Sequence, residues 1–436
     1  MDRKYLYGQW LDSQSRKANS KRKYPKYFIG ERGYPHLDNK LFFPRIGNDP
    51  TRSVQLGDIV TSSENLKKYG FLPFIKKNTR QRRYREPPHD YKYSSLRGGR
   101  DQKLFPHIKY RPIMYAGHED ACIFSFYSFC LEQLYEAELI NRQLQNNVIA
   151  YRSIDGKSNI DFAKEAFLEL INRTEYDCIM IDVKSFFDTI NHELLFKQWD
   201  TLLPGGFKAN AEDKIIYENI TAYRHINLNE SVQTLRRAGC KYIFRERGCL
   251  KLCRLQDYNK HLKKSVRKNK SGRGIPQGSP ISGMLANIYL LDFDQTMRQL
   301  IVNKYGGVYQ RYSDDIFIVC PRGLATKIYK KTNVALAKEK LTLGINKTEA
   351  FTKTSDQKQL LNITHQLEPT VSAKRTAAQY LGFHFEGEHI ILRPSTLSKH
   401  VRGRRNPNYL KSSYNKTLSP RVARQVNRIR RIVKSK

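Results

Sequence analysis

Acidic residues are scarce in this sequence. Its 436 residues include 41 Asp and Glu against 78 Lys and Arg, which gives a formal net charge of +37. So large an excess of one sign repels itself unless an anionic partner offsets it, and the usual partner is nucleic acid. A ribosomal or membrane-surface protein could share this charge. The shortage of acid is greatest in residues 393–436, which hold fourteen Lys or Arg and no Asp or Glu.

Long apolar runs are also missing. The N-terminal MDRKYLYGQW has no apolar core and predicts no signal peptide. The longest apolar stretch, ACIFSFYSFCL at residues 121–131, is too short to span a bilayer and predicts a buried helix. We therefore expect a cytoplasmic protein with no membrane partner.

Cysteine is sparse and irregularly spaced. Seven Cys, an odd number, predict reduced thiols rather than a disulfide framework. Cys249, Cys253 and His261 could form a zinc site with Cys240, although the spacing matches no standard zinc finger. Cysteines that are simply buried are the alternative.

Aromatic residues are plentiful, and the chain is long enough for several sub-domains. Its 27 Tyr, 21 Phe and 39% hydrophobic residues predict a folded body rather than a disordered basic tail.

Residues 1–58 show weak periodicity and predict an irregular basic extension. The stretch FLPFIKKNTRQRRYR (71–85) is either a solvated loop or an arm that grips a phosphate backbone. Residues 117–170 are predicted to be mostly helical.

Two adjacent carboxylates interrupt an apolar run in RYSDDIFIVC (311–320). Asp314 and Asp315 repel each other, and we expect a hairpin formed by GGVYQRY and IFIVC, with Ser313 and Asp314 near its turn. Asp182 ends another apolar strand, and a helix is predicted to begin near Asp188 or Asn191.

Three carboxylates at strand ends predict a magnesium site. Mg²⁺ prefers oxygen ligands and completes its shell with water and substrate phosphates. Two such ions about 3.5–4 Å apart can activate a primer hydroxyl and stabilise the leaving pyrophosphate. Ordinary turn aspartates, nucleases and other two-metal enzymes stay open at this point.

Six segments, in order, resemble the motifs of reverse transcriptases. KYRPIM (109–114) resembles a fingers motif, and the palm motifs are resembled by DVKSFFD, GIPQGSPISGMLANIYL, YSDD, LTLGINKTE (341–349) and YLGFHF (380–385). The resemblance implies an α+β right-hand polymerase with fingers, a palm of antiparallel sheet plus helices, and a helical thumb. We expect an N-terminal extension at 1–58, fingers at 59–170, a palm at 171–385 with a long insertion at 193–270, and a basic thumb or tail at 386–436.

The resemblance also implies catalytic and metal-binding residues. Asp182, Asp314 and Asp315 would bind two Mg²⁺ ions, or Mn²⁺, with Val183 beside them and Asp315 the least directly ligating. Lys347 matches a lysine that protonates pyrophosphate, in a segment shorter than usual.

Nucleotide contacts are implied in the same way. Lys109 and Arg111 would hold the triphosphate, Arg through its fixed fork of donors. Phe187 falls at the position of the steric gate that excludes a ribose 2′-hydroxyl, with a plain core residue as the alternative. The remaining implied contacts are Gln277, Gly278 and Tyr312, with Pro280 shaping the loop.

Missing segments narrow the subfamily. About fifty residues follow YLGF, with no HNH-like cluster as in many group II intron enzymes and no room for the ribonuclease H domain of retroviral enzymes. The Val-Thr-Gly near the thumb and the Asn-Ala-containing insertion that are usual in retron enzymes are also missing. AYRSIDGKSNIDFAKEAF (150–167) and residues 275–294 look similar to bacterial defence-associated reverse transcriptases of the unknown-group and abortive-infection lineage. This similarity implies an antiphage enzyme that copies a partner noncoding RNA into DNA from dNTPs, with a homo-oligomer allowed.

Three alternatives of other kinds remain open from the sequence. A mobile-element or group II intron-like reverse transcriptase would have no defence role. A maturase-like RNA-binding protein would have lost catalysis, although all three carboxylates are intact. An RNA polymerase would use rNTPs, which the bulky ring of Phe187 disfavours.

Overall fold

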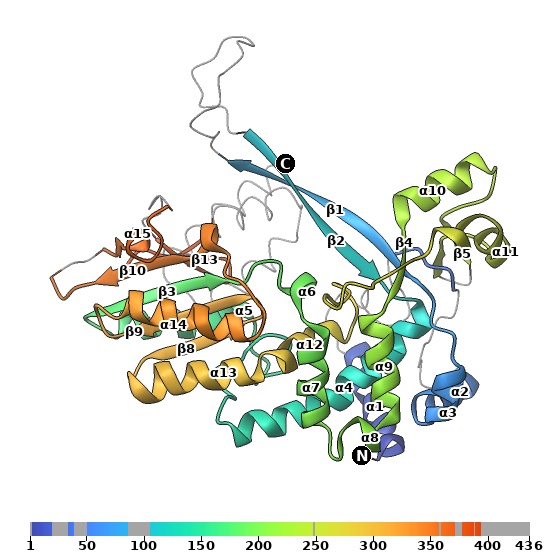
Figure 1. Cartoon of the computed structure of the whole chain (residues 1–436), viewed down its shortest axis with the longest axis horizontal. Coiled ribbons are helices and arrows are strands. Elements are labelled where there is room, and N and C mark those ends of the chain that lie inside the picture. The colour runs from blue at the N-terminus through green and yellow to red at the C-terminus, as the bar shows by residue number, and fades with distance from the viewer. Residues whose placement is uncertain are drawn as a thin grey trace, which may run out of the picture. The chain divides into compact units, whose positions relative to one another are not determined.

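The computed structural model describes two compact units, and the chain is drawn in Figure 1. Unit 1 comprises Met1–Cys130 and Phe207–Ser282, and unit 2 comprises Leu131–Gly206 and Gly283–Lys436. The residues described are 2–19, 34–38, 50–85, 105–246, 249–356, 359–370, 377–387 and 389–393.

A five-stranded antiparallel sheet forms the centre of unit 2. Its order is β11(Leu361–Asn362), β10(Glu349–Lys353), β3(Tyr176–Asp182), β9(Asp315–Cys320), β8(Val308–Tyr312). Successive side chains of a strand point to opposite faces, yet nearly every residue of β3 and β9 is buried. Both faces of the sheet are therefore covered, which explains why these strands read as continuous apolar runs.

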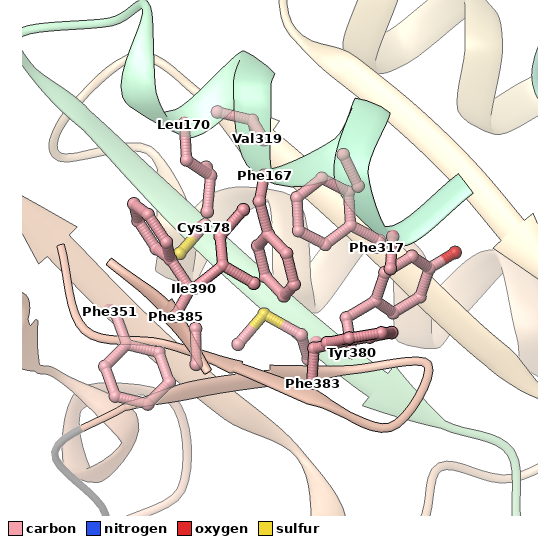
Figure 2. Close-up of a cluster of buried hydrophobic side chains, with 14 of the residues drawn as sticks. Phe167, Leu170, Cys178, Phe317, Val319, Phe351, Tyr380, Phe383, Phe385 and Ile390 are labelled. Carbon is pink, nitrogen blue, oxygen red and sulfur yellow. The ribbon is translucent and has the colours of Figure 1, made fainter. Parts of the chain in front are cut away.

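An aromatic cluster fills one face of this sheet (Figure 2). Helix α5 (Asn159–Ile171) contributes Phe167, whose ring stacks 5.4 Å from that of Phe385. Phe385 belongs to a separate three-stranded sheet, β12(Ala378–Tyr380), β13(Phe383–Phe385) and β14(Ile390–Leu392). The YLGFHF motif thus builds the core beneath the central sheet. Strand β14, near the start of the segment predicted as thumb, pairs with β13 in the three-stranded sheet. Residues 394–436 lie outside the described residues.

Helix α5 and the helix that begins at His192 have capping side chains at their N-termini, Ser158 and Asn191. The Asn191 side chain accepts a hydrogen bond from the backbone N–H of Leu194, 3.1 Å, which confirms the predicted helix start at this residue. The other helices that lie in this unit wholly or in part are α4(His118–Asn141), α6(Phe186–Thr189), α7(His192–Leu202), α12(Ser282–Tyr289), α13(Leu291–Arg298), the π-helix Gln299–Lys304, α14(Ala325–Lys338), the 3-10 turn Ile345–Lys347 and α15(Thr364–Leu367). The apolar stretch at 121–131 lies in α4 and is buried, as predicted.

Unit 1 contains a four-stranded sheet and a small two-stranded one. The larger has the order β2(Phe105–Tyr115), β1(Phe74–Arg85), β4(Arg224–Asn227), β7(Arg267–Lys268), and the smaller pairs β5(Phe244–Glu246) with β6(Cys249–Lys251). Residues 74–85 are therefore a strand, paired antiparallel with β2. Because β4 runs parallel to β1, residues 207–282 join unit 1, whereas residues 193–206 belong to unit 2.

The N-terminal segment is not the irregular extension that we predicted, because residues 3–19 form helix α1 (Arg3–Asn19). Trp10 is fully buried and packs edge to face on Phe126, 6.0 Å between rings. Arg3 pairs with the buried Asp213. Tertiary contacts stabilise this helix. Its sequence has only a weak apolar periodicity, and for this reason the helix was not predicted. The other helices of this unit are α2(Pro50–Val60), α3(Ser63–Lys68), α8(Gly206–Ala209), α9(Ala211–Thr221), α10(Leu228–Arg237), α11(Leu255–Asp257), the π-helix Tyr258–Leu262 and the 3-10 turn Lys263–Ser265.

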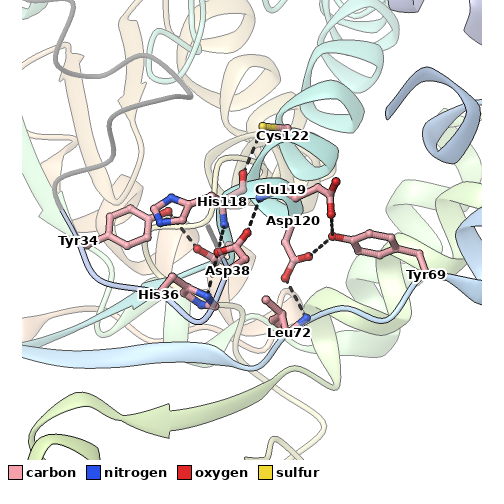
Figure 3. Close-up of polar contacts among 10 residues, drawn as sticks. Tyr34, His36, Asp38, Tyr69, Leu72, His118, Glu119, Asp120 and Cys122 are labelled. Carbon is pink, nitrogen blue, oxygen red and sulfur yellow. Dashed lines mark hydrogen bonds and ion pairs between the residues drawn. The ribbon is translucent and has the colours of Figure 1, made fainter. Parts of the chain in front are cut away.

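A buried polar network fastens residues 34–38 to the start of α4 (Figure 3). The carboxylate of Asp38 accepts the backbone N–H groups of His118 and Glu119, each at 2.9 Å, which satisfies two otherwise unpaired donors of the helix. Although burial opposes it, the hydrogen bond and charge of His36 hold the pKa of Asp38 at about 2. Burial raises the pKa of Asp120, which accepts a bond from Tyr69, to about 7.

No helix in the described ranges is both long and apolar enough to cross a bilayer. The six cysteines whose side chains are described are free thiols.

Candidate active site

The acidic pair lies at the turn between β8 and β9. Tyr312, the last residue of β8, pairs with Asp315, the first of β9, so Ser313 and Asp314 form the turn as predicted. Ser313 is buried and has φ 60°, a left-handed backbone that a non-glycine residue rarely adopts. Local strain of this kind is typical of functional sites.

Strand pairing brings the third carboxylate to the same edge of the sheet. Asp182 lies directly opposite Asp315 across the β3–β9 ladder. The backbone N–H of Val183 donates to the carbonyl oxygen of Asp314, 3.1 Å, which fixes this register beyond the end of the strand. Like charges directly opposite each other destabilise a sheet, so the three carboxylates occupy an edge that a cation would stabilise.

The neighbouring carboxylates affect the pKa of Asp315. Asp315 is exposed at the first position of β9, where it lies opposite Asp182 and next to Asp314. Partial desolvation at this position, followed by the charges of Asp314 and Asp182, raises the pKa of Asp315 to about 7.

Lys347 lies against the triad. Its Nζ is 2.5 Å from each carboxylate oxygen of Asp182. The preceding Gly344 donates its N–H to the Asp182 carbonyl, 2.6 Å, and a Cβ on this glycine would lie 2.8 Å from Asp182 Oδ2. Only glycine lets the 3-10 turn approach β3 so closely, a requirement that was not predicted from the sequence. The catalytic role of Lys347 stays a prediction.

The donor chemistry of the triad fits a divalent cation. Three carboxylates offer hard oxygen ligands, and a cation would relieve their mutual repulsion. As the side chains lie here, Lys347 takes both oxygens of Asp182, so a cation would require this ion pair to open. In the described part of the chain, no three or more His, Cys, Asp or Glu side chains are arranged to hold a metal. This also applies to Cys240, Cys253 and His261 of the zinc hypothesis.

Phe187 lies in α6, shortly after the end of β3. The preceding Ser185 has φ 51°, which turns the chain sharply out of the strand. The half-buried Phe187 ring meets Phe186 at 5.7 Å and Tyr151 at 6.4 Å. Its role as a steric gate stays a prediction.

A fully buried ion pair supports the turn from behind. Arg311 Nε and Nη2 donate to the two carboxylate oxygens of Asp294 at 2.7 and 2.6 Å, and both side chains are 0% exposed. Arg311 Nη1 donates to the Ser313 carbonyl at 3.2 Å, and Tyr309 donates to Asp294 at 2.5 Å. This pair was not predicted from the sequence, although a charged residue two positions before SDD inside an apolar strand was an available signal.

The predicted triphosphate contacts lie in unit 1. Lys109 and Arg111 are two residues apart on β2. Arg111 is exposed, and the side chain of Lys109 lies outside the described residues.

The loop of the GIPQGSP motif packs on the same strand. Gln277 accepts the N–H of Met114 at 2.8 Å. Gly278 has φ 114°, and a Cβ there would lie 3.0 Å from Ile113 Cγ2 and from the Met114 carbonyl. Glycine is therefore required at this contact. The remaining predicted contact, Tyr312, lies in unit 2, where it donates to Asn159 at 3.0 Å. All these nucleotide contacts stay predictions.

Comparison with known families defines the class of the domain. Residues 220–385 match the family model described as reverse transcriptase (RNA-dependent DNA polymerase). The chain therefore contains a reverse transcriptase domain, whose class is that of RNA-directed DNA polymerases, which are nucleotidyltransferases. Together with the antiparallel sheet and its helices, this match confirms the predicted right-hand polymerase fold.

Individual proteins give weaker likenesses. No curated protein matches the sequence. Among solved structures, apo telomerase from Candida tropicalis truncated from its C-terminal domain is similar at 12% identity, over 66% of this chain and 53% of that one, with a TM-score of 0.41. Telomerase from Candida albicans in complex with a TWJ fragment of telomeric RNA is similar at 12% identity, over 84% and 56%, with a TM-score of 0.38. The chain spans about half the length of these telomerases.

Proposed function

We propose that this chain is a reverse transcriptase that extends DNA from dNTPs on an RNA template. The observation that carries the proposal is the pairing of Asp182 with Asp315, with Asp314 in the adjoining turn, in a chain that contains a reverse transcriptase domain. A binding protein that had lost catalysis would not need to maintain these like charges side by side.

The triad would hold Mg²⁺, or Mn²⁺, with Val183 beside it. When bound, two such ions supply activation of the primer hydroxyl and charge stabilisation of the leaving pyrophosphate. Lys347, already in contact with Asp182, would turn to the leaving group and provide its proton. Lys109 and Arg111 would bind the triphosphate, with Gln277 and Gly278 shaping the nucleotide site.

The two units correspond to sub-domains of the right-hand polymerase fold in our proposal. We assign the fingers to unit 1, with its β1–β2 hairpin, and the palm to unit 2, with its central sheet. The basic segment after Arg393, predicted as thumb or tail, lies outside the described residues.

We further propose that the template is a dedicated noncoding RNA and that the enzyme serves antiphage defence in the cytoplasm of a bacterium. The similarity of residues 150–167 and 275–294 to defence-associated enzymes supports this proposal. The test is sequencing of the nucleic acid that co-purifies with the wild type and with the Asp314→Ala/Asp315→Ala variant. One dominant RNA in both samples, with complementary DNA in the wild type alone, is the expected result. Heterogeneous RNA without enzyme-dependent DNA would contradict it.

Substitution of the gate residue is expected to change sugar selection. Phe187→Val removes most of the ring that would collide with a ribose 2′-hydroxyl, so the preference for dNTP over rNTP should fall about 10- to 200-fold. The ratio of kcat/KM for the two substrates in primer extension measures the effect. The control is Phe351→Leu, at a buried position in the core cluster of the central sheet, which should leave this ratio unchanged.

The outer surface of residues 224–273 is suited to RNA. This segment holds fifteen Lys or Arg against three Asp or Glu. Two of these acidic side chains form ion pairs with basic side chains of the same segment, Glu230 with Arg267 at 3.0 Å and Glu246 with Lys251 at 2.8 Å. Leu235, Leu252 and Leu262 of this segment are buried in a core cluster. Basic side chains such as Arg254, Lys260 and Lys268 are exposed.

Neutralising part of this surface should weaken RNA binding. Lys260, Lys263 and Lys264 are exposed, and their replacement by Gln should reduce the slope of log affinity against log salt by about 0.7–0.9 for each phosphate that the protein no longer neutralises. The matched control replaces three exposed lysines of α14, namely Lys330, Lys331 and Lys338, by Gln. An equal reduction of the slope in both triple variants would show that binding depends on overall charge rather than on this surface.

A further inference from the structure

Tyr151 lies where three parts of the unit 2 site meet. Its hydroxyl is hydrogen-bonded to Ser313 Oγ at 3.2 Å, in the turn that carries Asp314. Its ring meets the Phe187 ring edge to face, with centroids 6.4 Å apart and planes at 85°. On another side it lies against α12, where a Cβ on Gly283 would come within 2.7 Å of the Tyr151 ring carbons.

The backbone of Tyr151 is held in a conformation that it would not adopt by itself. Its φ is 59°, in the left-handed region, which is unfavourable for a bulky L-residue. Residues on both sides are fastened: the Ala150 carbonyl accepts from Asn287 Nδ2 at 2.8 Å, and Arg152 Nε donates to Glu136 at 2.6 Å. Surrounding contacts therefore hold the backbone of Tyr151 in this strained conformation, which fixes the direction of its side chain.

We propose that Tyr151 is a positioning residue for sugar discrimination, which holds the Phe187 ring in its gate position. This inference rests on the proposed function. A gate excludes a 2′-hydroxyl only if its ring cannot move aside when the extra oxygen arrives. Tyr151 is exposed over 47% of its surface, but its ring lies against Gly283 on one side and its backbone is fastened on both sides, so it resists displacement toward α12.

The contact with Ser313 extends this role to the catalytic turn. Tyr151 touches the gate through its ring and the turn through its hydroxyl, so the two functions are separable by substitution. Tyr151→Phe removes the hydroxyl and keeps the edge-to-face contact. Tyr151→Ala removes both, and Tyr151→Leu keeps apolar bulk without the aromatic edge.

The test compares Tyr151→Ala, Tyr151→Leu and Tyr151→Phe by the ratio of kcat/KM for dNTP and rNTP, with thermal unfolding recorded for each. The ratio should fall about 2- to 10-fold in the Ala and Leu variants, the size of an aromatic pair contact, and stay unchanged in the Phe variant. In a Phe187→Val background the Ala substitution should have no further effect on the ratio, since its partner is gone. The exposed Tyr5 on α1 supplies the control, Tyr5→Ala.

Each contrary result has a distinct meaning. An unchanged ratio in folded Tyr151→Ala and Tyr151→Leu, beside a reduced ratio in Phe187→Val, would overturn the positioning role and leave the gate in place. An unchanged ratio in Phe187→Val would overturn the gate and this role together. A wild type that incorporates rNTPs as readily as dNTPs would overturn the proposed function itself.

Discussion

Primer extension is expected to fall about 10³-fold or more when Asp314→Ala and Asp315→Ala are combined, because both substitutions remove groups at the reacting centre. RNA binding should persist, since the triad contributes negative charge that does not attract a phosphate backbone. Single-nucleotide extension of a labelled primer measures the first effect, and titration of the same RNA measures the second.

The same variant should fold at least as well as the wild type. Folding raises the pKa of Asp315 from its ordinary value of 3.8 to about 7, mainly through desolvation. The folded state therefore binds a proton that the unfolded state has lost, and this residue's contribution to stability falls as pH rises from about 4 to 7. In EDTA, the advantage of the double variant over the wild type should be larger at pH 8 than at pH 4.

A matched control uses two exposed aspartates of the same unit, Asp155 and Asp356, each replaced by Ala. This variant should extend primers at the wild-type rate. Synthesis by the purified Asp314→Ala/Asp315→Ala protein at a rate close to that of the control would remove the triad from catalysis.

The second large effect is expected at the buried pair behind the turn. Arg311→Met leaves the carboxylate of Asp294 buried without its cation, which should lower the free energy of unfolding by about 3–5 kcal/mol. The substitution also frees the Ser313 carbonyl, so primer extension should fall even below the unfolding temperature. Urea-induced unfolding and extension assays measure the two effects.

Two comparisons isolate the cause. Arg142→Met removes the partly exposed ion pairs of Arg142 with Asp292 and Glu138, each of which should cost below about 1 kcal/mol. Arg311→Met with Asp294→Leu removes both charges and should recover most of the stability, because an apolar pair needs no ionic partner. A double variant as unstable as Arg311→Met alone would show that packing volume, not the buried charge, dominates.

The sequence by itself determined the local features of this protein. The apolar runs before Asp182 and after Asp315 are the predicted strands, Ser313 and Asp314 form the predicted turn, and Asn191 caps the predicted helix. These features depend on residues close together in the chain, where side-chain pattern and backbone preference act directly. The motif order was also sufficient to identify the reverse transcriptase domain.

Tertiary structure decided which of these features meet. The register that sets Asp182 opposite Asp315 joins residues 133 positions apart, and the contact of Tyr151 with Phe187 depends on a strained backbone held by neighbouring elements. Helix α1 likewise forms where Trp10 finds a buried site on Phe126. No local pattern encodes such contacts, because their free energy comes from burial and pairing between segments that meet only in the folded chain.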